Sequence, residues 1–100
     1  MGTYERTTAA SIRDVLAQAE EFLTGRLPIR KTGGDKHSVT LEGGDGKVTL
    51  AAHKHGLDTT VTASTDQLRT SRLDVDVQLF MSTLPYQPGE GRTRRENAGI

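Results

Sequence analysis

Three short runs of alternating apolar and polar residues follow one another between residues 36 and 65. Alternation with a period of two is typical of a β-strand that buries one of its faces. The runs are separated by Gly43-Gly44-Asp45-Gly46 and by His55-Gly56, which contain the residue types that tight hairpin turns prefer. The stretch therefore predicts a three-stranded antiparallel meander, and the rest of the chain must cover its apolar face.

The first turn predicts how the first two strands pair. Pairing Glu42 with Lys47 across this turn places Thr40 opposite Thr49 on the polar face. The same register aligns apolar residues with apolar residues on the other face, whereas a slip by one residue would mix the two faces. Turn and pattern therefore indicate the same register.

The second turn predicts the pairing of the second and third strands. With His55-Gly56 as the two-residue loop, His53 lies opposite Asp58, and on a neighbouring row Thr49 lies opposite Thr62. A nearby carboxylate favours a charged imidazole, so His53 and Asp58 would resemble the orienting half of a catalytic triad. No activated nucleophile accompanies them, so we expect a solvated cross-strand pair, no catalytic residues and no enzyme.

A helical pattern begins near Thr8. Thr7 or Thr8 is expected to cap the start of this helix, and Gly25 is expected to close its end in the left-handed conformation. The preceding residues 2–7 fit either a short edge strand or an irregular start. The apolar stripe of the helix consists of Ile12, Val15, Leu16, Ala19, Phe22 and Leu23.

Residues 27–32 alternate again and predict a fourth strand, placed before the meander in the chain. Pro28 lies near its start, which suits a strand at the edge of a sheet. The Gly33-Gly34-Asp35 segment is expected to turn this strand into the meander.

Residues 71–84 fit both a strand and a helix. Four strands make a sheet roughly 19 Å wide, whereas one helix with its side chains is about 10 to 12 Å across. A second helix is therefore needed to cover the apolar face. Thr70 or Ser71 can cap such a helix and Pro85 can end it, so we expect the helix.

These elements predict a two-layer α+β fold. It has a four-stranded antiparallel sheet in meander order, with an N-terminal and a C-terminal helix on one face (α-β4-α). If residues 2–7 form a strand, the order resembles in topology the β-α-β4-α arrangement of TATA-binding-protein-like helix-on-sheet domains. We expect residues 1–85 to form a single α+β domain, and residues 86–100, which carry Pro88 and an Arg-rich cluster, to be a disordered tail.

Composition restricts the partners of the chain. Thirteen basic and 13 acidic residues give a formal net charge of zero, so no global field attracts nucleic acid or an anionic membrane. No apolar run is long enough to span a bilayer, and we expect a cytoplasmic protein. Only 33% of the residues are hydrophobic, which predicts a thin core and hence a homo-oligomer, with a dimer favoured.

No cofactor or metal is expected. The chain has no cysteine and no complete phosphate-binding loop. By strand parity His37 falls on the apolar side with Val39, so His37, His53 and His55 are not expected to converge on a metal ion.

Two surfaces are candidates for contacts. In a helix over 71–84, Val75 and Leu79 lie four residues apart on the outer side, as a candidate oligomer contact. We therefore expect a self-associating binding or assembly module; the alternative is a binder of a small ligand or peptide on the Thr-rich sheet face. That face is predicted to hold Arg30, Thr40, Thr49 and Thr62 in one row, with Ser38 and Thr60 in the next.

Overall fold

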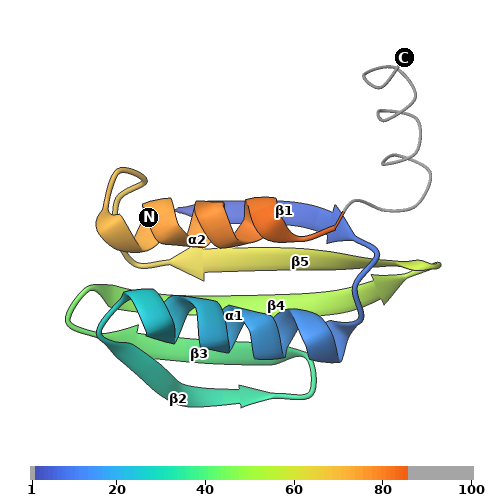
Figure 1. The fold of residues 1–100 in the computed structure, drawn as a ribbon, viewed down its shortest axis with the longest axis horizontal. Coiled ribbons are helices and arrows are strands. Elements are labelled where there is room, and N and C mark those ends of the chain that lie inside the picture. Colours follow the sequence, from blue (N-terminus) through green and yellow to red (C-terminus); the bar gives the residue numbers. More distant parts are fainter. Residues whose placement is uncertain (1, 86–100) are drawn as a thin grey trace.

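Five antiparallel strands form an open sheet, and two helices cover one of its faces (Figure 1). This computed structural model describes residues 2–85, so the tail expected over 86–100 lies outside the described residues. The strands lie in the order β1-β5-β4-β3-β2. The elements in chain order are β1 (Thr3–Thr8), α1 (Ile12–Arg26), β2 (Ile29–Asp35), β3 (Ser38–Gly43), β4 (Gly46–His55), β5 (Asp58–Thr65) and α2 (Arg72–Thr83).

The α+β class and the antiparallel sheet are confirmed. The sheet has five strands rather than four because, of the two alternatives for residues 2–7, the edge strand is the one that forms. Residues 3–8 form a fifth strand, β1, which pairs with β5 at the edge of the sheet. On the helix-covered side, β1 makes polar contacts instead of presenting an apolar stripe. The Tyr4 phenol donates to Asp74, and the Thr8 hydroxyl donates to the Pro85 carbonyl. The strand is therefore held by tertiary hydrogen bonds that its own sequence does not reveal.

The register predicted for the first hairpin is confirmed, because Glu42 lies opposite Lys47 and Thr40 opposite Thr49. The register predicted for the second hairpin is wrong by two residues. His55 lies opposite Asp58, so the loop is Gly56-Leu57 rather than His55-Gly56.

The backbone conformation of Gly56 explains this change of register. Gly56, with φ of +67°, is the first residue of the loop, the position at which a type II′ turn takes glycine. A shift of two residues keeps every side chain on its predicted face. Leu57 is the exception, because it sits at the hairpin tip and is 89% exposed rather than packed on the apolar face.

The strand β2 is longer than predicted and contains the two glycines expected in a turn. A bulge lies between Lys31 and Gly33, and the actual turn is formed by Lys36 and His37. Gly34 adopts a φ of +139°, and a Cβ added there would lie 2.9 Å from the Cα of Val39. Close backbone approach, and not chain reversal, therefore explains the glycine.

Both helices begin at serine caps. Ser11 Oγ accepts the Asp14 N–H at 3.1 Å, so Ser11 caps α1, while Thr8 is the last residue of β1. The helix continues through Gly25 and ends at Leu27 in an extended conformation, so the predicted left-handed glycine is wrong.

The segment 71–84 forms a helix, as expected: α2 spans Arg72–Thr83, and Ser71 caps it by accepting the Asp74 N–H at 3.0 Å. The core lies between the helices and the sheet, with α1 against β2, β3 and β4, and α2 against β1 and β5 (Figure 1). Its fully buried members include Val15, Leu23, Leu41, Leu50, Val61, Leu73 and Val77.

Candidate functional site

The face of the sheet opposite the helices is open (Figure 1), and its central rows carry small polar side chains. The predicted centre of this face is confirmed, since the hydroxyl oxygens of Thr40 and Thr49 lie 3.2 Å apart. The predicted row is wrong at both ends. Arg30 lies opposite Glu42, and Thr62 lies opposite Ala51 in a neighbouring row. The central row is Gly33, Thr40, Thr49, Ser64 and Thr3, and the next is Asp35, Ser38, Ala51, Thr62 and Glu5.

A shallow depression of about 200 Å³ lies at one end of this face, between Lys47 and Asp66. The Asp66 carboxylate accepts the Lys47 N–H at 2.9 Å and the Gln67 side-chain N–H at 3.1 Å. These hydrogen bonds hold the pKa of Asp66 below its ordinary value, with the bond from Lys47 as the largest cause. The Asp66 carboxylate therefore already has hydrogen-bond donors within the protein.

The histidines are arranged differently from the prediction. His53 lies opposite Thr60, so the predicted pair of His53 and Asp58 does not form. His37 lies in the β2–β3 turn rather than on the apolar side, and its ring stacks on that of His53 with a centroid distance of 6.1 Å. Among residues 2–85 no group of three His, Asp or Glu side chains could hold a metal ion.

The carboxylate of Asp74 is the most deeply buried charge of the described chain and has a full set of donors. Tyr4 donates to it at 2.6 Å, Ser71 at 2.8 Å, and the Thr65 hydroxyl lies 2.8 Å and 2.9 Å from its two oxygens. Burial, followed by the hydrogen bond to Asp74, raises the pKa of Tyr4 above 10.0. These hydrogen bonds to Asp74 join β1, β5 and α2, so the Asp74 cluster has a structural role.

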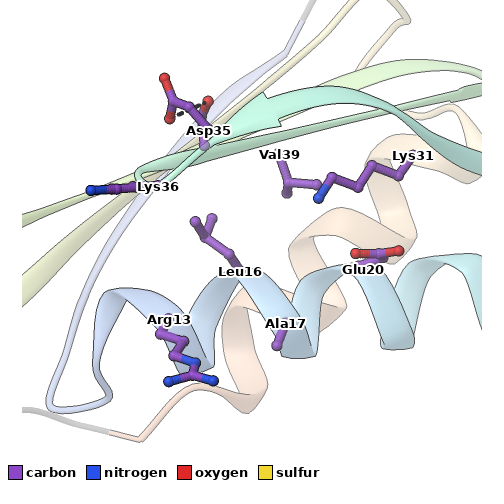
Figure 2. Close-up of a pocket in the computed structure, with 9 residues that line it drawn as sticks. Arg13, Leu16, Ala17, Glu20, Lys31, Asp35, Lys36 and Val39 are labelled. Atoms are coloured by element: carbon purple, nitrogen blue, oxygen red, sulfur yellow. Dashed lines mark hydrogen bonds between the residues drawn. The ribbon is translucent and has the colours of Figure 1, made fainter.

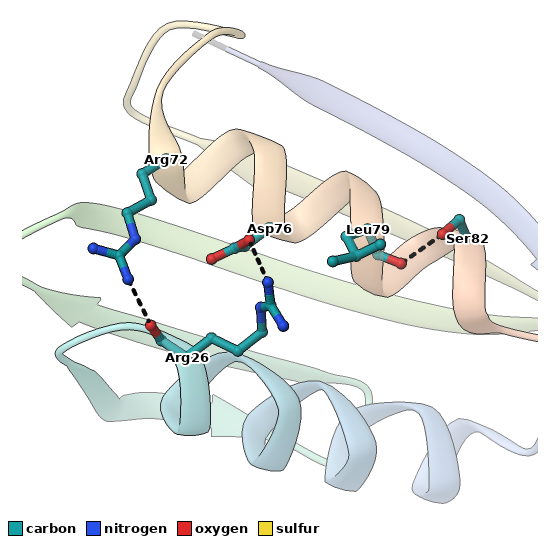
Figure 3. A network of polar contacts seen from close by, with 5 residues as sticks. All are labelled: Arg26, Arg72, Asp76, Leu79 and Ser82. Atoms are coloured by element: carbon teal, nitrogen blue, oxygen red, sulfur yellow. Dashed lines mark hydrogen bonds and ion pairs between the residues drawn. The ribbon is translucent and has the colours of Figure 1, made fainter.

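The outer side of α2 carries two exposed apolar residues, as the helical pattern predicted. Val75 is 52% exposed and Leu79 is 42% exposed. Figure 3 shows Leu79 beside a polar bridge to α1, in which Arg26 pairs with Asp76 at 3.4 Å and Arg72 donates to the Arg26 carbonyl at 3.2 Å. The two helices are therefore fastened to each other at this end, which makes their outer surface a defined platform.

A groove of about 300 Å³ runs between the two helices on this outer surface. Phe22 and Phe80 form its base with ring centroids 5.6 Å apart, and Arg26 lies 5.2 Å above the Phe22 ring. Glu21 and Thr83 lie at its sides. The groove thus offers aromatic surface next to the exposed residues of α2.

A larger groove, of about 420 Å³, lies between α1 and the β2–β3 hairpin (Figure 2). Leu16 of α1 and Val39 of β3 form its apolar floor, the exposed Ala17 lies at its rim, and Lys31 extends across it. The sequence interpretation missed this groove because it assigned Gly33 and Gly34 to a turn. A pair of glycines inside an alternating strand was the signal that could have indicated it.

No protein-family model matches this chain, and neither does any curated protein or solved structure. Functional inference therefore rests on the surfaces described above. Within residues 2–85, neither helix has the length and apolar character needed to cross a bilayer.

Proposed function

We propose that the protein is a small self-associating binding or assembly module and that two copies meet through the outer side of α2. The observation that carries this proposal is the pair Val75 and Leu79, which lie about one turn apart on one side of a helix and are 52% and 42% exposed. Large apolar side chains gathered on a rigid element favour an interface.

The other exposed apolar residues support this choice by contrast. Leu57 lies at the tip of a hairpin, and Leu68 lies in the segment between β5 and α2. Neither belongs to a pair of exposed apolar residues on one helix or strand. Single exposed leucines are normal on protein surfaces. Only on α2 do two such residues share one side of an element within the described chain.

An antiparallel, two-fold arrangement fits the charges of this surface. A two-fold interface places the same patch of each copy against the other. With α2 packed antiparallel on its copy, Arg72 at the start of one helix approaches Thr83 at the end of the other, and Glu21 lies beside Thr83 in the groove. Arg72 and Glu21 are both exposed, so this contact adds specificity more than affinity.

Sedimentation velocity and light scattering over a wide concentration range test this proposal. We expect a dimer that becomes monomeric in the double variant Val75→Glu/Leu79→Glu, because two charges would be buried at the contact. The matched control is Leu57→Glu, which places the same charge on a leucine that is also exposed but lies at a hairpin tip. A wild-type monomer at high micromolar concentration would overturn the proposal.

The open sheet face is the competing surface. Apart from Asp35 and Glu5, its central rows contain only glycine, alanine, serine and threonine, so another sheet or an extended peptide could approach the backbone closely. The variant Thr62→Arg puts a long charged side chain in the middle of this face. If Thr62→Arg dissociates the dimer and Val75→Glu/Leu79→Glu does not, the contact is the sheet and the α2 interface is wrong.

Ligand or peptide binding on the open face is the second candidate function. The small side chains at Ser38, Ala51 and Thr62 favour it, because a partner backbone can reach the sheet over them. The 200 Å³ depression on this face is smaller than the roughly 300 to 1,000 Å³ of most small-molecule sites, which favours a peptide over a compact ligand. Chemical shift changes confined to the turns on screening a peptide library would contradict it.

A further inference from the structure

We infer that the groove between α1 and the β2–β3 hairpin binds an amphiphilic carboxylate, whose charged group lies at the end of the groove that carries Arg13 and Lys36 and whose apolar body covers Leu16 and Val39. This site is independent of the α2 surface, which lies on the other side of α1.

The groove exists because β2 supplies no apolar side chain above α1. Of the residues that β2 turns toward the helices, Ile29 is buried at the start of the strand, but the next positions hold Lys31 and Gly34. A side chain at Gly34 is prevented by the backbone of Ser38 and Val39. Leu16 therefore faces the sheet but is only partly covered by it, and remains half-buried.

The floor of the groove is apolar and suitably sized. Leu16 and Val39 form it, Ala17 lies at its rim, and the volume of the groove, about 420 Å³, falls within the roughly 300 to 1,000 Å³ range of small-molecule sites. The helix contributes Arg13 and Glu20 at positions seven residues apart, so the floor is about 10 Å long at 1.5 Å per residue. A medium-length acyl chain matches this shape.

The charges of the groove are unequal at its two ends. Lys31 and Glu20 lie at the same end in Figure 2 and offset each other. Arg13 and Lys36 lie toward the other end, where Asp35 is the available carboxylate.

Asp35 offsets only one of these two cations, and in Figure 2 its carboxylate lies on the side of the hairpin away from α1. Its carboxylate accepts the His37 N–H at 2.8 Å and the Ser38 hydroxyl at 3.1 Å, so it is committed to the hairpin turn. Neither Arg13 nor Lys36 makes a side-chain hydrogen bond or ion pair with any of residues 2–85. The net positive charge at this end of an apolar trough is complementary to a carboxylate with an apolar body, and a guanidinium can bind it through two hydrogen bonds.

A purely structural explanation accounts for only part of this arrangement. A lysine that points inward from an edge strand, as Lys31 does, also protects the strand from pairing with other chains. That explanation covers neither Arg13, which lies on the helix, nor the incomplete burial of Leu16 beneath the strand. Binding of an amphiphilic carboxylate would account for both the cations and the open apolar floor.

The test is a titration of the full chain with octanoate, followed by amide chemical shifts. We expect saturable shifts at Leu16, Ala17, Gly34 and Val39. Octyltrimethylammonium, which has the same apolar chain and the opposite charge, should give at least about tenfold weaker binding at these amides. The variant Val75→Glu/Leu79→Glu should bind octanoate as the wild type does.

Two sets of variants locate the site. Arg13→Gln/Lys36→Gln should weaken octanoate binding at least about fivefold, as expected for the loss of two exposed charges. The matched control Lys47→Gln/Lys54→Gln removes two exposed lysines of β4 and should leave the affinity unchanged. Ala17→Glu, at an exposed helical position that tolerates glutamate, should weaken binding by adding a negative charge at the rim of the groove.

Three results would overturn the inference. They are the absence of saturable shifts at the floor residues, equal binding of octyltrimethylammonium, and unchanged affinity in Arg13→Gln/Lys36→Gln. Because Arg13 and Lys36 are exposed, these substitutions leave the core intact, and an unchanged unfolding midpoint verifies that the variant is folded.

Discussion

The phenol of Tyr4 donates a hydrogen bond of 2.6 Å to the carboxylate of Asp74 and thereby joins the first strand of the sheet to the last helix. Asp74 has no solvent-exposed surface, and the hydroxyls of Thr65 and Ser71 donate to it as well. A buried carboxylate is tolerated only when hydrogen-bond donors replace the water it has lost. The edge strand β1 is thus held by a polar cluster rather than by an apolar stripe.

Replacing Asp74 should destabilise the fold strongly. In Asp74→Ala the hydroxyls of Tyr4 and Thr65 lose their acceptor inside the protein, and we expect the free energy of unfolding to fall by about 2 to 4 kcal/mol. Urea denaturation measures this loss. Asp76→Asn is the comparison, because its partner Arg26 is 48% exposed and that ion pair should contribute less than about 1 kcal/mol. Equal losses in the two variants would contradict a special role for the Asp74 cluster.

The stability of the fold should decrease at alkaline pH through Tyr4. Burial, then the hydrogen bond and the charge of Asp74, raise the pKa of Tyr4 above 10.0, although the nearby Arg69 lowers it in part. A raised pKa in the folded state means that the protonated phenol stabilises the fold. This contribution is complete below about pH 10 and is lost as the pH rises through the higher folded value.

Absorbance of the phenolate checks this prediction directly. The chain has two tyrosines, Tyr4 and Tyr86, so a Tyr86→Phe background leaves Tyr4 as the only reporter. Tyr4→Phe should flatten the alkaline part of the stability profile. Titration of Tyr4 at or below its ordinary value in the folded protein would show that burial and Asp74 do not act on it as described.

The parts of the fold that could be predicted from the sequence are those for which turn residues or hydrophobic period allow one arrangement. The register of β3 and β4 follows from the pairing of Glu42 with Lys47, because both turn and hydrophobic pattern specify it. Helix α2 follows from the width of the sheet that it must cover, and the exposure of Val75 and Leu79 follows from its period.

The second hairpin was mispredicted because two registers satisfy the same rules. Loops at His55-Gly56 and at Gly56-Leu57 each contain the glycine and keep the same faces, so only the backbone conformation of Gly56 distinguishes them. The consequence was a false pairing of His53 with Asp58. The sequence pattern therefore predicted the faces of the sheet better than the neighbours within each face.

The partners of strand β1 and the shape of the groove below β2 were not predicted for a different reason. The positions of β1 on the helix-covered side include Arg6 and Thr8, which bond to the carbonyls of Leu84 and Pro85 more than 70 residues away in the chain. The groove depends on the distance between α1 and Gly34. Neither relationship leaves a periodic signal.

Acid should weaken the β2–β3 hairpin through Asp35. The N–H of His37, followed by the Ser38 hydroxyl, holds the pKa of Asp35 below its ordinary value of 3.8. A lowered pKa in the folded state means that the ionised carboxylate stabilises the fold. This contribution is present above about pH 3.8 and is lost as the pH falls through the lower folded value.

Asp35→Asn tests this by removing the titrating group from the turn. We expect the variant to be less stable than the wild type at neutral pH, and the difference to shrink as the pH falls below about 3.8. Asp58→Asn serves as the control, since the Asp58 side chain accepts no hydrogen bond from residues 2–85. A constant difference between Asp35→Asn and wild type at all pH values would count against the prediction.

Replacing Thr59 by valine should increase the stability of the fold. The side chain is fully buried on the helix-covered face of β5, and its Oγ1 has no hydrogen-bond partner among residues 2–85. Valine has nearly the same shape, so Thr59→Val removes an unsatisfied polar group without opening a cavity. We expect urea denaturation to show a gain of about 1 kcal/mol.

The matched variant Thr65→Val makes the same chemical change on the same strand and face with the opposite expectation. The Thr65 hydroxyl donates to Asp74 and accepts the Gly2 N–H at 3.3 Å, so its removal should cost about 1 to 3 kcal/mol. The sign of the effect therefore depends on the hydrogen bonding of the hydroxyl and not on burial, because both threonines are buried. Destabilisation of similar size in both variants would mean that Thr59 has a hydrogen-bond partner after all.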